Sequence, residues 1–76
     1  MIKIKGKVTY EDLEGGFWGI IDENGSKWIP VPMPEQLKQE GANVQLTAIV
    51  LEDYQTVYMW GTPIVIKSFH TLPLLN

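Results

Sequence analysis

The chain has 76 residues with six lysines, no arginine and nine acidic residues, so its formal net charge at neutral pH is −3. This length fits one small domain without room for a large internal cavity, which argues against an enzyme with a deep pocket. The absence of cysteine excludes disulfides and thiolate metal sites. The acidic balance and the missing arginine disfavour nucleic acid as a partner, because such modules gain affinity by neutralising phosphates.

Membrane insertion and export are also disfavoured by the sequence. No run of 18 apolar residues is present, so no segment is expected to span a membrane. The first five residues alternate between apolar and basic side chains and lack the apolar centre of a signal peptide. We therefore expect a cytoplasmic protein; the alternative is the mature domain of an exported protein.

Residues 2–10 alternate in the manner of a half-buried strand, with Ile2, Ile4, Val8 and Tyr10 on one side. Gly6 occupies the apolar side where a larger residue is expected. A glycine at such a position marks a bend or the close approach of another backbone. A long first strand that curls to join two sheets would need this residue.

The next segment predicts a hairpin. Residues 11–15 form a connection of hairpin length, and an apolar strand follows over residues 16–22. Asn24-Gly25 between two apolar runs indicates a two-residue type I′ turn, in which both central residues need a positive φ. The returning strand covers residues 26–30.

Three prolines within residues 30–34 end this strand, because proline cannot donate a ladder hydrogen bond. Pro34 suits the first turn of a helix, and residues 34–40 contain good helix formers up to a stop at Gly41. Two turns are too short to be stable alone. The helix is therefore expected to dock through Leu37.

Further strands are predicted in the second half. Residues 44–51 form the fourth, and residues 56–60 and 64–69 are rich in β-formers on either side of a break at 61–63. These two pieces represent one kinked strand or two strands around a bulge. We assign residues 1–69 to the barrel domain and residues 70–76 to an apolar C-terminal tail.

The order of three strands, a short helix and further strands resembles the OB-fold. The predicted fold class is therefore all-β: a five- to six-stranded antiparallel Greek-key barrel with one short helix between strands three and four. Residues 13–20 and Met59-Trp60-Gly61 are also similar to small prokaryotic domains of this type without an assigned function. An SH3-like barrel is the alternative, although its single helical turn usually precedes the last strand.

Aromatic residues are numerous for this length. The OB-fold resemblance implies that strands two and three present a face on which bases or sugars stack. The candidate ligand-binding residues are Trp18, Trp28, Trp60 and Tyr58. The alternative is that these aromatic side chains fill and cover the core.

Acidic residues gather in two loops that flank the ligand face of an OB-fold. The candidate partner-binding residues are Glu11, Asp12, Glu14, Glu52 and Asp53. Carboxylates there repel phosphate and favour a basic protein surface. The alternative is that they are ordinary solvated loop residues.

No catalytic or metal-binding set is recognisable. Asp22, Asn24 and Ser26 have part of the spacing of a calcium loop, but the required glycine and glutamate positions do not match. His70 is the only histidine and has no cysteine or second histidine with which to bind zinc. Lys3, Lys5 and Lys7 form a basic stripe that Lys67 could join, although lysines also protect exposed strand edges.

We therefore expect a small non-catalytic binding module whose partner is a protein, including self-association through the apolar tail or an open strand edge. The alternative is a binder of single-stranded nucleic acid or of an oligosaccharide through the aromatic residues of strands two and three. No enzyme activity, no cofactor and no metal are expected.

Overall fold

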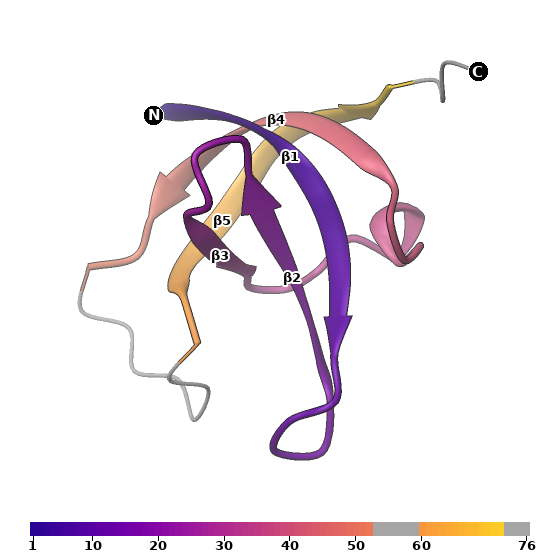
Figure 1. Cartoon of the computed structure of the whole chain (residues 1–76). Helices are drawn as coiled ribbons and strands as arrows, with labels where there is room; N and C mark the ends of the chain where they lie inside the picture. Colours follow the sequence, from indigo (N-terminus) through magenta and orange to yellow (C-terminus); the bar gives the residue numbers. More distant parts are fainter. Residues whose placement is uncertain (53–59, 73–76) are drawn as a thin grey trace.

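The computed structural model describes residues 1–52 and 60–72, and these residues form a closed five-stranded barrel (Figure 1). The strands follow one another around the barrel in the order β1-β2-β3-β5-β4, and β4 closes the barrel against β1. Their bounds are β1 Ile2–Glu11, β2 Phe17–Asp22, β3 Lys27–Pro30, β4 Asn43–Val50 and β5 Thr62–Thr71, with one 3-10 turn, η1 Glu35–Leu37.

This topology confirms the predicted OB-like barrel. Four of the neighbouring strand pairs are antiparallel, and β3 and β5 are parallel, with Trp28 opposite Thr62 and Pro30 opposite Ile64. The helical turn lies between the third and fourth strands, as expected. The β3–β5 ladder is short, so β5 has a strand neighbour on that side over only three residues.

Gly6 is the point where β1 changes partners. It pairs with Asp22 of β2 and also with Val44 of β4, so the strand belongs to both sides of the barrel. A Cβ atom on Gly6 would collide with the carbonyl group of Ile21 and would lie 2.7 Å from Cα of Asp22. The prediction of a close backbone approach at this glycine is confirmed.

The β2–β3 hairpin is confirmed, but the predicted type I′ turn is wrong. The amide of Gly25 donates to the Asp22 carbonyl at 3.0 Å, and the amide of Asp22 donates to the Ser26 carbonyl at 2.9 Å. Gly25 has a φ of +83°, and Glu14 is the only non-glycine residue with a positive φ in the described chain. The loop is therefore a three-residue connection that ends in a left-handed glycine.

The helix expected over residues 34–40 is reduced to the single turn η1. Pro34 is extended, with φ −61° and ψ 137°, and Lys38 has already left the helical region with ψ 66°. The chain beyond it is held against β1, because Gly41 donates to the Val8 carbonyl at 2.8 Å and the Val8 amide donates to the Ala42 carbonyl at 2.9 Å. These bonds prevent a second turn.

β5 includes two residues of the predicted break at 61–63 and ends later than the predicted residue 69. Thr62 and Pro63 belong to the strand, because the Pro63 carbonyl accepts a hydrogen bond from the Leu51 amide at 3.0 Å and needs no donor in return. The strand runs on through Thr71, and a bulge opposite Thr47 and Ala48 leaves Lys67 as the extra residue. The β-rich residues 56–59 lie outside the described ranges.

The core is a single aliphatic cluster inside the barrel. Leu37 is fully buried within it, so the docking expected of this side chain is confirmed although the helix is short. Its other members come from four of the five strands: Ile4, Val8, Ile20, Val44, Leu46, Ala48 and Ile64. Within the described residues, no helix is long and apolar enough to cross a membrane.

Candidate interaction surface

A second packing centre lies on the outer face of β2. Phe17 and Gly19 are two residues apart and therefore share one face of the strand, opposite the side of Ile20, which belongs to the core. Phe17 is only 6% exposed because the Trp60 ring lies edge-on to it, with the centroids 5.5 Å apart. We call Phe17, Gly19 and Trp60 the outer aromatic cluster.

Trp60 can pack against this face because residue 19 is a glycine. A Cβ atom on Gly19 would lie 2.7 Å from Cη2 of the indole. Next to Trp60, a Cβ on Gly61 would lie 2.7 Å from the Lys27 carbonyl oxygen, and the Lys27 ammonium sits 5.3 Å from the Trp60 ring centroid. Residues 17–19 and 60–61, which belong to the two stretches singled out by resemblance, thus meet here through packing.

Trp18 and Trp28 lie on the opposite side of their strands from the outer aromatic cluster. Trp18 pairs with Tyr10 and Trp28 pairs with Ile20, so the two indoles are not cross-strand neighbours. Both are partly buried against the core. The strand pairing therefore places the Trp18 and Trp28 side chains on the inner side of β2 and β3, at the margin of the core.

Asp22 organises the turn beside Trp28. One carboxylate oxygen accepts the amides of Asn24 and Ser26, each at 2.9 Å, and the other accepts the Trp28 indole N–H at 2.9 Å. The indole hydrogen bond is the largest cause of a lowered Asp22 pKa, and the two backbone amides act in the same direction. Both carboxylate oxygens of Asp22, the first residue of the calcium-like spacing, are therefore used in the turn and by Trp28.

The connection between β1 and β2 carries exposed apolar side chains. Tyr10 is 44% exposed and Leu13 is 50% exposed. The Tyr10 ring lies edge-on to Trp18, with centroids 5.0 Å apart, and its hydroxyl occupies the place that a Cβ on Gly16 would need. These contacts hold the Tyr10 ring against Trp18 and Gly16.

The loop backbone needs its glycines. Glu14, Gly15 and Gly16 are consecutive residues with positive φ, of 49°, 89° and 95°. The Gly16 amide closes the loop by donating to the Leu13 carbonyl at 2.8 Å. A run of left-handed residues is costly except at glycine, so the sequence Glu-Gly-Gly specifies this loop shape.

Carboxylates flank these apolar side chains along the chain at Glu11, Asp12 and Glu14, and Glu40 reaches the Tyr10 backbone through the fold. Glu11 accepts the Thr9 hydroxyl at 3.0 Å, and Glu40 accepts the Tyr10 backbone amide at 2.6 Å. Ion pairs in the described residues join only Lys5 to Glu23 and Lys38 to Glu35, so no lysine neutralises this group. We define the loop-end surface as Tyr10 and Leu13 with the carboxylates Glu11, Asp12, Glu14 and Glu40.

The remaining predicted residues are distributed elsewhere. Glu52 is exposed just beyond β4. Asp53 and Tyr58 lie outside the described residues. Sequence reasoning missed Glu40, which lies 30 positions from Tyr10 along the chain and reaches the loop only through the fold. Tyr10 and Leu13 were detectable as apolar residues beside an acidic loop, but they were assigned to the core side and to a connection.

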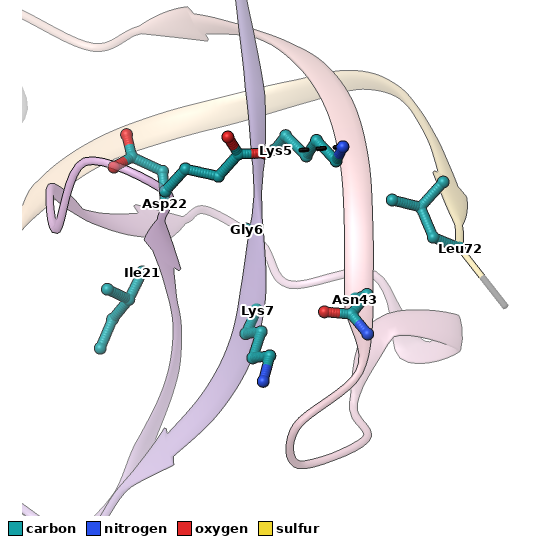
Figure 2. A pocket seen from close by; sticks show the side chains of 8 residues that line it. Lys5, Gly6, Lys7, Ile21, Asp22, Asn43 and Leu72 are labelled. Atoms are coloured by element: carbon teal, nitrogen blue, oxygen red, sulfur yellow. Dashed lines mark ion pairs between the residues drawn. The ribbon is translucent and has the colours of Figure 1, made fainter. Parts of the chain in front are cut away.

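The basic stripe on β1 is partly neutralised. A hollow of about 330 Å³ is lined by Lys5 and Lys7 together with Asp22 and Glu23, over a floor that includes Gly6 (Figure 2). The Lys5 ammonium and a Glu23 carboxylate oxygen are 3.6 Å apart. Two ammonium groups and two carboxylates give this hollow no net charge, so it is a poor site for phosphate.

No group of acidic residues or histidines in the described ranges has the geometry to hold a metal ion. Comparison of the chain with known protein families, with curated proteins and with solved structures found no match.

Proposed function

We propose that this protein is a small binding module that recognises a basic segment of a protein through the loop-end surface. The observation that supports it is the pair of exposed apolar side chains, Tyr10 and Leu13, in a segment whose neighbouring carboxylates have no ion-pair partner in the described residues. The similarity to small prokaryotic OB-like domains supplies no activity, so the proposal depends on this surface.

The chemistry of the loop-end surface suits a partner with alternating basic and apolar side chains. Tyrosine and leucine supply apolar area that association removes from water, and aromatic residues are enriched in interface cores. Carboxylates at the rim attract lysine and arginine and repel acidic partners, which sets orientation and association rate more than affinity. The pre-formed Glu14–Gly16 backbone lowers the ordering cost of binding.

The usual ligand face of the fold is less suited to this role. In this protein Trp60 lies on Gly19 and against Phe17, so the outer face of β2 is covered by the chain itself. A ligand that stacks on Phe17 would have to displace the indole. The loop-end surface needs no such displacement.

The proposal is tested with a defined probe, a capped peptide of alternating lysine and leucine with one central phenylalanine. Isothermal titration of the full chain should give binding that weakens as salt is raised from about 50 to 300 mM, because the rim contacts are screened. Leu13→Ser should weaken it about fivefold, and Ile49→Ser, also at an exposed apolar residue, should not. Equal binding of a glutamate-for-lysine peptide would contradict the proposal.

Self-association is a separate outcome. If the loop-end surface binds the lysine stripe of a second copy, light scattering should show a mass that rises with protein concentration and falls with salt. A chain ending at Leu72 tests the role of the tail beyond the last described residue. If the full chain and the chain ending at Leu72 have the same mass at each protein concentration, the tail is not part of the interface.

Binding of single-stranded nucleic acid is a second candidate, favoured by one observation. The partly exposed Trp60 indole has the Lys27 ammonium 5.3 Å from its ring centroid, which places an aromatic face and a cation together. Oligo-deoxythymidine at low salt should then quench tryptophan fluorescence in the wild type and not in Trp60→Phe. No quenching at tens of micromolar would exclude this candidate.

A further inference from the structure

The outer edge of β5 is a second feature that the loop-end surface does not explain. β3 lies beside β5 only from Thr62 to Ile64, and the last bond on that side runs from the Val31 amide to the Ile64 carbonyl at 2.8 Å. Pro32 and Pro34 follow and have no amide N–H to donate. The later part of β5 has β4 as its only strand neighbour in the described residues.

The register shows which backbone groups face this edge. The Leu72 amide donates to the Asn43 carbonyl at 2.9 Å, so residues of the same parity, His70 and Ser68, direct their N–H and C=O groups toward β4. Phe69 and Thr71 therefore direct theirs away from β4. These two residues present two donors and two acceptors in the spacing of a strand edge.

A hollow of about 470 Å³ lies against the same stretch of β5, and its lining includes Gln36, Gln39, Asn43, Phe69, His70 and Thr71. Gln36 of η1 and Gln39, two residues beyond the end of η1, contribute to this lining. The three amide side chains make no hydrogen bond with another residue in the described chain. His70 is the only ionisable side chain in this lining.

The geometry points to an extended peptide as the ligand of this hollow, added as a strand beside Phe69–Thr71. Phe69 and Thr71 offer the backbone groups of a strand edge, and the Gln36 and Gln39 side-chain amides in the same lining can both donate and accept, as a main chain requires on its two sides. The near absence of charge in the lining favours main-chain recognition over capture of a phosphate or a carboxylate. Four residues, 69–72, span about 13 Å, enough to pair with a short segment.

Hydrogen exchange of the free protein provides the first test. The amides of Phe69 and Thr71 should exchange much faster than those of Ser68 and His70, which bond to β4. Equal protection of all four amides would show that the edge is already paired and would overturn the inference.

The second test uses a random heptapeptide library selected against the full chain. An enriched peptide should slow exchange of the Phe69 and Thr71 amides at least tenfold. N-methylation of the alternate amides on one edge of the peptide should abolish binding, whereas N-methylation on the other edge should leave most of it. No enrichment, or enriched peptides that leave these two amides unchanged, would overturn the inference.

Matched variants separate this site from the loop-end surface. Gln39→Ala should weaken the enriched peptide about two- to tenfold, the loss expected for one hydrogen bond. Gln45→Ala removes an exposed amide from β4 that does not line the hollow, and it should change nothing. Leu13→Ser should also leave this binding intact, and a loss with Leu13→Ser would assign the peptide to the loop-end surface instead.

Discussion

The aliphatic core inside the barrel and the outer aromatic cluster on β2 bury side chains in different ways. The core uses interlocking aliphatic residues from four strands and η1, whereas the outer cluster depends on one indole placed over a glycine. The comparison shows how the face that commonly binds ligands in this fold is used for packing here. This packing is why we propose the loop-end surface and the edge of β5, instead of this face, as the places for binding.

The largest effect is expected in the core. Ile20 is fully buried, and Ile20→Ala should lower the free energy of unfolding by about 3–4 kcal/mol through lost burial and a cavity. Urea denaturation followed by circular dichroism measures this loss. A cost below about 1 kcal/mol would show that the inner cluster does not dominate stability.

Trp60→Ala should cost less, about 2 kcal/mol, because the indole is only partly buried and its removal uncovers Phe17 from one side. The same denaturation experiment gives the value. A cost larger than that of Ile20→Ala would reverse the proposed ranking of the two clusters.

Gly19→Ala should cost about 1–2 kcal/mol, because the new methyl group forces the Trp60 ring away from β2. The double mutant with Trp60→Ala sharpens the assignment, since the added methyl then has no indole to displace. The cost of Gly19→Ala should nearly vanish in that background. Additive costs would show that the collision is with backbone instead.

The smallest effect concerns the turn. The folded-state pKa of Asp22 is lowered, chiefly by the Trp28 indole hydrogen bond, so the stability it contributes is present above pH 3.8, the ordinary pKa, and is lost as pH falls through the lower folded value. Trp28→Phe should move the Asp22 pKa back toward 3.8. Carbon-13 NMR titration of the carboxyl group measures it, and an unchanged pKa would refute the assigned cause.

Local patterns predicted the elements of this barrel, but not how distant segments meet. The bend at Gly6 and the burial of Leu37 followed from strand alternation and from the instability of a short helix. The turn at Asn24 was assigned wrongly because both loop types use Asn-Gly, and only the position of the left-handed residue separates them. Pro63 was read as a break although a proline carbonyl still accepts a ladder bond.

The candidate surface was harder to predict, since it depends on contacts between segments far apart in sequence. Period-two alternation places Phe17 and Trp18 on opposite faces but does not say which face is inside. That choice depends on Trp60, more than 40 residues away, which covers Phe17. Glu40 likewise joins the loop-end surface only because residues 41–42 bond to Val8.

The most direct test of the account is a map of backbone amide chemical shifts in the full chain during titration with the lysine-leucine peptide. Binding at the loop-end surface should place the largest shift changes on residues 10–16, with the Phe17, Gly19 and Trp60 amides changing little. Largest changes at Gly19 and Trp60, with residues 10–16 unaffected, would contradict it and return the ligand site to the outer face of β2.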